Sequence, residues 1–294
     1  MEVKLNIYIF QFLKIWEDNE KKFSNISGFS LIEILIGIVI TSIMMGAMYT
    51  SYNVVNNSFS QVTGRASVSA AGRDVSAMLI RELRMAGFRY YGDNLYFDDG
   101  RGLDGRENNH YPIIIREPAD SCCDRIEIVY GDYDSSRDGT EIDPKFLRFK
   151  VIYFAALEDG NYNLYKVKLK WNNAEQHWVY VYGGTPDAVY PDTPITVRDA
   201  ELLRKYVVNM EFVPIDNDGN VISTPLTVDK NEEYLNQIRT LDLKITFRSK
   251  DDFFKKKIIR KIESIKGAVR HVNQEDKFLR DSIVLSVFTR NIGS

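Results

Sequence analysis

An almost unbroken run of apolar residues covers positions 29–52, and its single charged residue is Glu33. A helix rises about 1.5 Å per residue, so a run of this length crosses a hydrocarbon layer roughly 30 Å thick. The pattern therefore predicts a membrane-spanning helix over residues 29–52.

A second, amphipathic pattern follows the apolar run and predicts a continuation of the helix over residues 53–88. One face of residues 66–88 collects apolar side chains at helical spacing, namely Val75, Met78, Leu79 and Leu83. Gly87 is a typical stop at a helix C-terminus. Residues 53–64 are polar and end in Gly64, which leaves two helices joined by a loop as the alternative.

The rest of the chain, residues 89–294, has the short alternating pattern of a β-rich globular head. In residues 164–171, for example, apolar residues alternate with three lysines, so the two kinds lie on opposite sides of a strand. The predicted strands cover residues 125–130, 147–154, 164–171, 178–182, 206–214, 241–247 and 282–289. One long helix followed by about seven or eight strands predicts an α+β fold with a mainly antiparallel sheet.

Positive charge flanks only the N-terminal side of the apolar run, which gives the predicted membrane helix an orientation. Lys21 and Lys22 precede the run, and no further Lys or Arg occurs until Arg65. This asymmetry places the N-terminal side in the cytoplasm and the head outside it. A cleaved secretory signal would need a small-x-small site, which residues 46–49 match poorly. A plain signal anchor remains as an alternative but leaves Glu33 unexplained.

Glu33 needs a reason, since a carboxylate at the centre of a membrane helix costs about 2.5–3.5 kcal/mol and usually has a partner. Gly28-Phe29-Ser30-Leu31-Ile32-Glu33, followed by the apolar run, resembles the processing signature of type IV prepilins and pseudopilins. The resemblance implies that a membrane prepilin peptidase removes residues 1–28 as a cytoplasmic leader and that the new amine of Phe29 is methylated. A leader of this length is long for the family.

The new amine offers Glu33 a partner. An α-amino group has a reference pKa near 7.7–8, so it is largely cationic at neutral pH, and methylation leaves it a cation. Glu33 lies one helical turn beyond Phe29 and is able to pair with the amine within the chain or on a neighbouring subunit.

Two further segments resemble minor pilins of the PilW type: residues 81–88 at the end of the predicted helix, and the last strand with residues 290–291 after it. The resemblance implies a minor pilin, a structural subunit that helps to initiate or cap a type IV pilus in adhesion, motility or DNA uptake. Its implied partners are the prepilin peptidase, other major and minor pilins, the inner-membrane assembly platform, and the membrane through residues 29–52. Its implied location is the inner membrane, as a single-pass precursor with the head outside the cytoplasm, and then the pilus.

Two alternatives stay open. A minor pseudopilin of a type II secretion system shares the signature. A membrane-anchored extracytoplasmic enzyme or sensor would need a catalytic or ligand-binding arrangement, but the three histidines have no metal-ligand spacing and no phosphate loop appears. The sequence therefore predicts that the protein is not an enzyme. The 44% apolar and 27% charged residues exclude wholesale disorder, and a formal charge of −3 gives no strong nucleic-acid signal.

Cys122 and Cys123 are adjacent and would lie in an oxidising compartment. The choices are a vicinal disulfide, two thiols or an intermolecular bond, and the vicinal disulfide is the preferred interpretation. No cofactor is expected. The acidic segment with Asp132, Asp134 and Asp138 is a weak calcium candidate. Residues 216–219 are another, but neither has the complete spacing of a calcium loop, and such residues also make turns.

The most basic stretch is residues 253–270, in which Phe254, Ile258, Ile262 and Ile265 fall at helical spacing. Its basic face suits lipid head groups, DNA or an acidic neighbouring subunit. The preferred interpretation is a solvated insertion ahead of the last strand.

Overall fold

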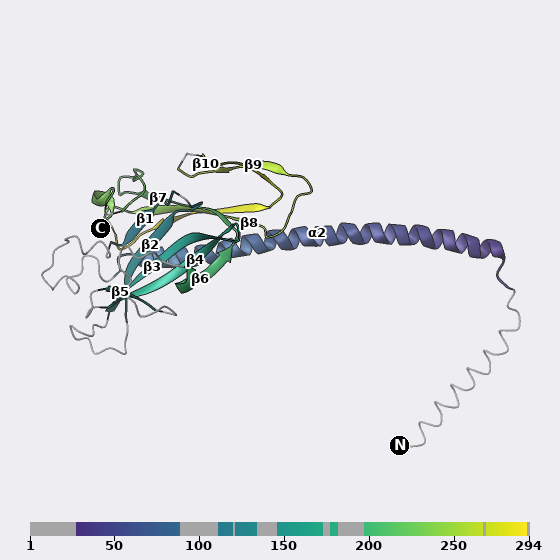
Figure 1. The fold of residues 1–294 in the computed structure, drawn as a ribbon, viewed down its shortest axis with the longest axis horizontal. Coiled ribbons are helices and arrows are strands. Elements are labelled where there is room, and N and C mark those ends of the chain that lie inside the picture. The colour runs from purple at the N-terminus through teal and green to yellow at the C-terminus, as the bar shows by residue number, and fades with distance from the viewer. Residues whose placement is uncertain are drawn as a thin grey trace, which may run out of the picture. The chain divides into compact units, whose positions relative to one another are not determined.

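The computed structural model describes residues 28–88, 111–119, 121–133, 146–172, 177–181, 197–227, 229–266 and 269–292. Within these ranges the chain forms one long helix and a set of antiparallel strands (Figure 1). The predicted α+β architecture is confirmed. The chain divides into two compact units, Met1–Ser60 and Gln61–Ser294.

Helix α2 (Leu31–Met85) is a single continuous element, so the alternative of two helices joined by a loop is wrong. In the first unit its apolar side chains are exposed; Ile34, Ile40 and Met48, for example, are each more than half exposed. Hydroxyl groups in this stretch bond to the helix's own carbonyls, as Thr41 Oγ1 does to Gly37 O at 2.7 Å. These polar groups are therefore satisfied within the helix, as a lipid environment requires.

In the second unit, the inward face of α2 is buried against the head. Its apolar side chains are 3% exposed or less, namely Val68, Val75, Leu79, Leu83 and Ala86. The prediction was correct for Val75, Leu79 and Leu83, but Met78 is 43% exposed and lies off this face. Gly72 also lies on the inward face, where a Cβ would clash with the side chain of Ile283.

The inward face of α2 carries a buried carboxylate, Glu82. The apolar pattern in the sequence did not place this residue on the buried face. Its Oε1 accepts a hydrogen bond from Lys166 Nζ at 2.6 Å, and its Oε2 accepts one from the Tyr153 hydroxyl at 2.7 Å. Burial is the largest cause that raises the pKa of Tyr153, and the nearby negative charge of Glu82 is the next. Together they raise this pKa far above its ordinary value, so the hydroxyl keeps its proton and donates it to a hydrogen bond. These contacts fix the position of the helix on the sheet.

Helix α2 ends at a turn that the C-terminal segment covers. Gly87 follows the helix with φ +76°, a left-handed conformation that glycine adopts at low cost. Its N–H donates to Val129 O at 2.9 Å, and the Asn291 side chain donates to Arg84 O at 3.1 Å. Gly87, the predicted helix stop, and Asn291, which follows the last predicted strand, therefore lie next to each other in the structure.

The first sheet has six antiparallel strands in the described ranges, in the order β1-β2-β3-β4-β5, with β6 also pairing with β4. They are β1 (Ile113–Arg116), β2 (Arg125–Tyr133), β3 (Phe146–Glu158), β4 (Asn161–Asn172), β5 (His177–Tyr180) and β6 (Glu201–Lys205). Strands β2 to β5 confirm four predicted segments. Strands β1 and β6 were not predicted, because runs as short as IIIR and ELLRK show no clear alternation.

The second sheet has the order β11-β8-β7 and is also antiparallel. Its strands are β7 (Val207–Ile215), β8 (Thr240–Arg248) and β11 (Arg280–Phe288), which confirm the other three predicted segments. Among the residues that the structure describes, the 3-10 helices η2 (Val197–Asp199) and η3 (Glu232–Tyr234) lie between strands.

The helical interpretation of residues 253–270 is wrong. Strand β9 (Ile258–Glu263) pairs with β10 (Val269–Asp276) in a separate two-stranded sheet. The isoleucines in this segment are β-branched and favour extended backbone. Their spacing fits a helical period, but it does not indicate a helix here. The three lysines ahead of β9, residues 255–257, are exposed, as expected for a solvated insertion.

Both faces of the first sheet contribute to hydrophobic cores. One cluster joins the sheet to α2 and the second sheet, and includes Ile128, Val151 and Leu164. The cluster on the other face consists of Val129, Ile152, Val167, Leu169, Trp171 and Trp178. The apolar side of β4 therefore faces away from the helix, while its lysine side supplies Lys166 to Glu82.

A buried ion cluster accompanies this sheet. Glu127 and Lys150 are each 4% exposed, and Arg116 and Arg125 lie 3.2 and 3.0 Å from Glu127 Oε1. Burial lowers the pKa of Lys150 to about 8, although Glu127 acts in the opposite direction. Burial also opposes the ionisation of Glu127, but Lys150, Arg125 and Arg116 together hold its pKa below its ordinary value.

We expect Lys150→Met to change how stability depends on pH. The lysine titrates near pH 10.5 when unfolded and near 8 when folded, so between these values the unfolded chain binds more protons. Stability should therefore rise with pH in this window for the wild type, and the rise should be smaller in the variant. Denaturant unfolding from pH 7 to 10.5 measures this, with exposed Lys205→Met as the control; equal slopes in all three proteins would contradict it.

Candidate processing and assembly site

The predicted cleavage bond lies outside the helix. Gly28, Phe29 and Ser30 have no helical assignment and are exposed, and α2 begins at the next residue, Leu31. Phe29 is 80% exposed, and a Cβ added to Gly28 would meet nothing within 4 Å. The peptide bond is therefore accessible, and the fold of this chain does not itself require glycine at position 28. A requirement for glycine would come from the enzyme that cuts the bond.

A capping box fixes the start of the helix. The backbone N–H of Ser30 donates to Glu33 Oε2 at 3.0 Å, and the backbone N–H of Glu33 donates to Ser30 Oγ at 3.3 Å. This reciprocal pair satisfies two N–H groups that a helix start leaves unpaired. The sequence signal for it, Ser-x-x-Glu ahead of an apolar run, is present but was not used in the prediction. The cap keeps Gly28 and Phe29 out of the helix.

Glu33 therefore has a role in the uncut chain as well as a predicted one after cleavage. It is the acidic residue in the first turn of α2, where the positive end of the helix dipole favours a carboxylate. Cleavage would add a cationic amine at Phe29, one turn away. The carboxylate is placed to serve both the helix start and a nearby amine.

Within the described ranges, α2 is the one helix long and apolar enough to cross a membrane, by length and composition, with a mean hydropathy of 2.2 in its best window. None of that window is buried inside the chain. Because apolar surface on this scale is unfavourable in water, the exposed half of the helix needs lipid or protein around it.

Residues 23–49 match the family model described as the prokaryotic N-terminal methylation motif. The chain carries this methylation motif. The matched range contains Gly28, Phe29 and Glu33 and much of the apolar run, so the motif and the accessible bond coincide. The match covers a small part of the chain and says nothing about the head.

Among solved structures, the chain is similar to a type IV-like pilin from Thermus thermophilus. The two are 12% identical, and the similarity covers 77% of this chain and 97% of that one at a TM-score of 0.40. A score of this size carries no argument about fold or function. The search of curated proteins gave no match.

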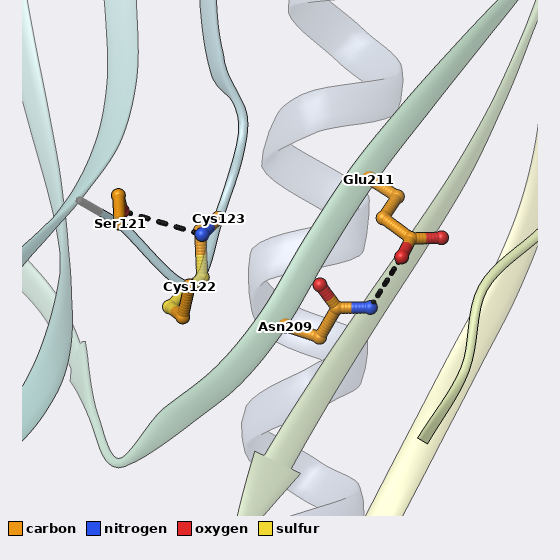
Figure 2. The surroundings of a disulfide bond; sticks show 5 residues. All are labelled: Ser121, Cys122, Cys123, Asn209 and Glu211. Atoms are coloured by element: carbon orange, nitrogen blue, oxygen red, sulfur yellow. Dashed lines mark hydrogen bonds between the residues drawn. A yellow bond between two sulfur atoms is a disulfide. The ribbon is translucent and has the colours of Figure 1, made fainter. Parts of the chain in front are cut away.

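The cysteine pair lies far from the methylation motif in sequence, inside the head. Cys122 and Cys123 are joined as a vicinal disulfide and are 3% and 1% exposed (Figure 2). The N–H of Cys123 donates to Ser121 Oγ at 3.2 Å, and the next residue, Asp124, donates its N–H to Met210 O at 2.8 Å. Burial at this depth leaves no surface for an intermolecular bond in the folded head.

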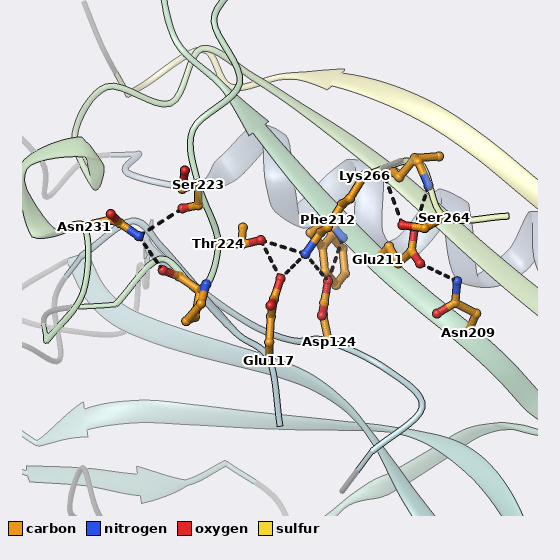
Figure 3. Close-up of polar contacts among 12 residues, drawn as sticks. Glu117, Asp124, Asn209, Glu211, Phe212, Ser223, Thr224, Asn231, Ser264 and Lys266 are labelled. Carbon is orange, nitrogen blue, oxygen red and sulfur yellow. Dashed lines mark hydrogen bonds and ion pairs between the residues drawn. The ribbon is translucent and has the colours of Figure 1, made fainter. Parts of the chain in front are cut away.

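Lys266 lies in the turn between β9 and β10 and takes part in a polar cluster (Figure 3). Its Nζ forms ion pairs with Glu117 and with Asp124 Oδ2, the latter at 3.2 Å, and donates to Thr224 Oγ1 at 2.8 Å. Asp124 is fully buried and also accepts the Phe212 N–H at 3.0 Å. One cation of the basic stretch is therefore used inside the head, which the prediction of a solvated insertion did not anticipate.

Glu211 holds the segment next to Lys266. It is fully buried and accepts hydrogen bonds from Ser264 Oγ at 2.9 Å, from the Ile265 N–H at 2.8 Å and from Asn209 Nδ2 at 2.8 Å. An isolated two-stranded hairpin is marginal in water, so these contacts at the turn between β9 and β10 help to order it. The hydrogen bonds to Glu211 hold this segment in place and do not form a reactive centre.

The calcium candidates find no support in the described ranges. Asp134 and Asp138 lie outside them, and Asp132 Oδ1 accepts the Tyr133 N–H at 2.9 Å. The carboxylate of Asp216 closes a turn instead, because it accepts the N–H groups of Asn220 and Asp218, which lower its pKa. Among the described residues, no group of three or more His, Cys, Asp and Glu is placed to hold a metal ion.

Proposed function

We propose that this chain is a type IV pilin-like structural subunit, a minor pilin made as a precursor and cut between Gly28 and Phe29. The observation that carries the proposal is the coincidence of the methylation motif with an accessible bond directly ahead of a continuous 55-residue helix. The mature chain would begin at Phe29, with a methylated, cationic amine one turn from Glu33. The proposal needs no catalytic residue in the head.

In this proposal the two halves of α2 have different tasks. The exposed apolar half anchors the subunit in the membrane before assembly and lies among neighbouring helices in the filament afterwards. The second half carries the head through Leu79, Leu83 and Glu82, which are buried against the sheets. The partners are the prepilin peptidase, other pilins and the inner-membrane assembly platform. The role is in initiating or capping the filament.

Sheared filaments test the proposed function. Cells lacking this chain should have fewer surface pili, and restoring it should restore them, with the chain present in small amounts in filaments sheared from the complemented cells. Immunoblotting of sheared and membrane fractions measures this. Normal pilus numbers without the chain would contradict a role in pilus assembly, and a loss of protein secretion instead would assign it to a type II secretion system.

A further inference from the structure

The β9–β10 hairpin is attached to the head through polar side chains. Among the described residues, β9 and β10 form a two-stranded sheet of their own, separate from the two larger sheets. At the turn of the hairpin, Lys266 Nζ forms ion pairs with Glu117 and Asp124, and Glu211 accepts hydrogen bonds from the two residues before Lys266 (Figure 3). Lys244 Nζ donates to the backbone carbonyl at the end of β9. The position of the hairpin therefore depends on where these partners in the head lie.

Asp124, one of those partners, follows directly after the vicinal disulfide of Cys122 and Cys123 (Figure 2). A bond between adjacent residues ties both side chains into one small ring, which restricts the backbone of the two cysteines. On either side of the bond, the Cys123 N–H donates to Ser121 Oγ at 3.2 Å and the Asp124 N–H donates to Met210 O at 2.8 Å. The disulfide ring and these hydrogen bonds together fix the segment beside β7.

The carboxylate of Asp124 needs that fixed position. It is fully buried, and its Oδ2 accepts the Phe212 N–H at 3.0 Å and a hydrogen bond from Lys266 Nζ at 3.2 Å. A buried carboxylate that loses its cation is strongly unfavourable. The contact with Lys266 is already at the long end of the ordinary range for such bonds, about 2.7–3.2 Å, so a small shift of Asp124 weakens it.

We infer that oxidation of the Cys122–Cys123 pair strengthens the docking of the β9–β10 hairpin on the head. Reduction breaks one S–S bond and forms two S–H bonds, with two electrons and two protons supplied by an external dithiol that becomes a disulfide. The backbone next to Asp124 is then less restricted, Lys266 loses part of its contact, and the hairpin is held by its remaining contacts. Because such coupling is reciprocal, the docked hairpin stabilises the disulfide by the same factor.

This inference goes beyond the proposed function and uses it only for the compartment. A head outside the cytoplasm meets oxidants, so the mature subunit carries the docked hairpin, whereas a reduced head carries a looser one. The oxidation state would then set whether the hairpin covers Asp124 and Glu211 or leaves them open to water. The tests use the purified chain, so their outcome does not depend on a role in a pilus.

Hydrogen exchange of the full-length chain in detergent tests the docking. In a C122S/C123S variant the amides of β9 and β10 should exchange roughly tenfold faster than in the oxidised wild type, while those of β3 and β4 keep their rates. K266Q should give the same local increase, and combining it with C122S/C123S should add little, because both changes remove one contact. K277M is the matched control: it breaks a partly exposed ion pair in the same insertion and should behave as wild type.

A thiol–disulfide equilibrium tests the reciprocal effect. The wild type, K266Q and K277M are held in mixtures of reduced and oxidised dithiothreitol until the thiol fraction is constant, and thiols are trapped by alkylation and counted by mass spectrometry. K266Q should shift the equilibrium toward the thiols roughly tenfold, which corresponds to about 30 mV for this two-electron couple. K277M should match the wild type.

An equilibrium in K266Q equal to that of the wild type would overturn the inference. Faster exchange throughout the head of C122S/C123S, with no excess in β9 and β10, would overturn it too, because the disulfide would then add only overall stability. If C122S/C123S does not fold, the dithiothreitol equilibrium of K266Q decides alone, since that variant keeps both cysteines.

Discussion

Leu79→Asp should unfold the head, because it removes a fully buried apolar side chain and places a carboxylate in the contact between α2 and the sheets. Losing the leucine alone costs about 2–5 kcal/mol, and burying an unpaired charge adds to that. Since domains of this kind are stable by only about 5–15 kcal/mol, the variant should be unfolded or aggregated. Denaturant unfolding of the full chain in detergent measures this through Trp171 and Trp178, which are buried in the head.

Met78→Asp is the matched control, one residue away on the same helix. Met78 is 43% exposed, so an aspartate there remains in contact with water and should change stability by no more than about 1 kcal/mol. Similar losses in both variants would mean that α2 does not pack on the head through the face assigned here.

Glu33→Gln should be cut normally but should enter filaments at least about tenfold less than the wild type, because breaking a desolvated ion pair costs several kcal/mol. Glutamine keeps an oxygen that accepts the Ser30 N–H, so the capping box survives while the charge is lost. Immunoblots of sheared filaments, normalised to the processed protein in the membrane, measure the effect.

Ser30→Ala separates the cap from the charge. It removes the Oγ acceptor of the Glu33 N–H but leaves the carboxylate charged, so we expect filament entry close to that of the wild type. If Ser30→Ala blocks assembly and Glu33→Gln does not, the essential property of this turn is its helix cap and not its charge.

The sequence predicted the features that depend on long or regular patterns. The apolar run gave the first half of α2, and alternation in segments such as residues 164–171 gave most strands. The sequence did not show which side of a strand faces the helix when one side is apolar and the other carries lysines. The lysine side of β4 turns toward α2 because Glu82 supplies an anion there, and the apolar side covers a second core.

Other errors have the same origin, since a spacing rule does not contain the tertiary contact. Met78 fits the helical stripe but lies at its edge, whereas Glu82 breaks the stripe and is buried through its hydrogen bonds to Tyr153 and Lys166. Ile258 and Ile262 fit a helical period and lie in a β-strand. At the candidate site, the roles of Gly28, Phe29 and Glu33 stay predictions, and the cap between Ser30 and Glu33 was overlooked.

We propose that the chain is cut after Gly28 and methylated at Phe29. Mass spectrometry of the N-terminal peptide, from protein purified from the membranes of its own cells, tests it most directly. We expect a peptide that begins with N-methylated Phe29 and no peptide that contains Lys21 or Lys22. A mature protein that retains those lysines, or begins at any other residue, would contradict it.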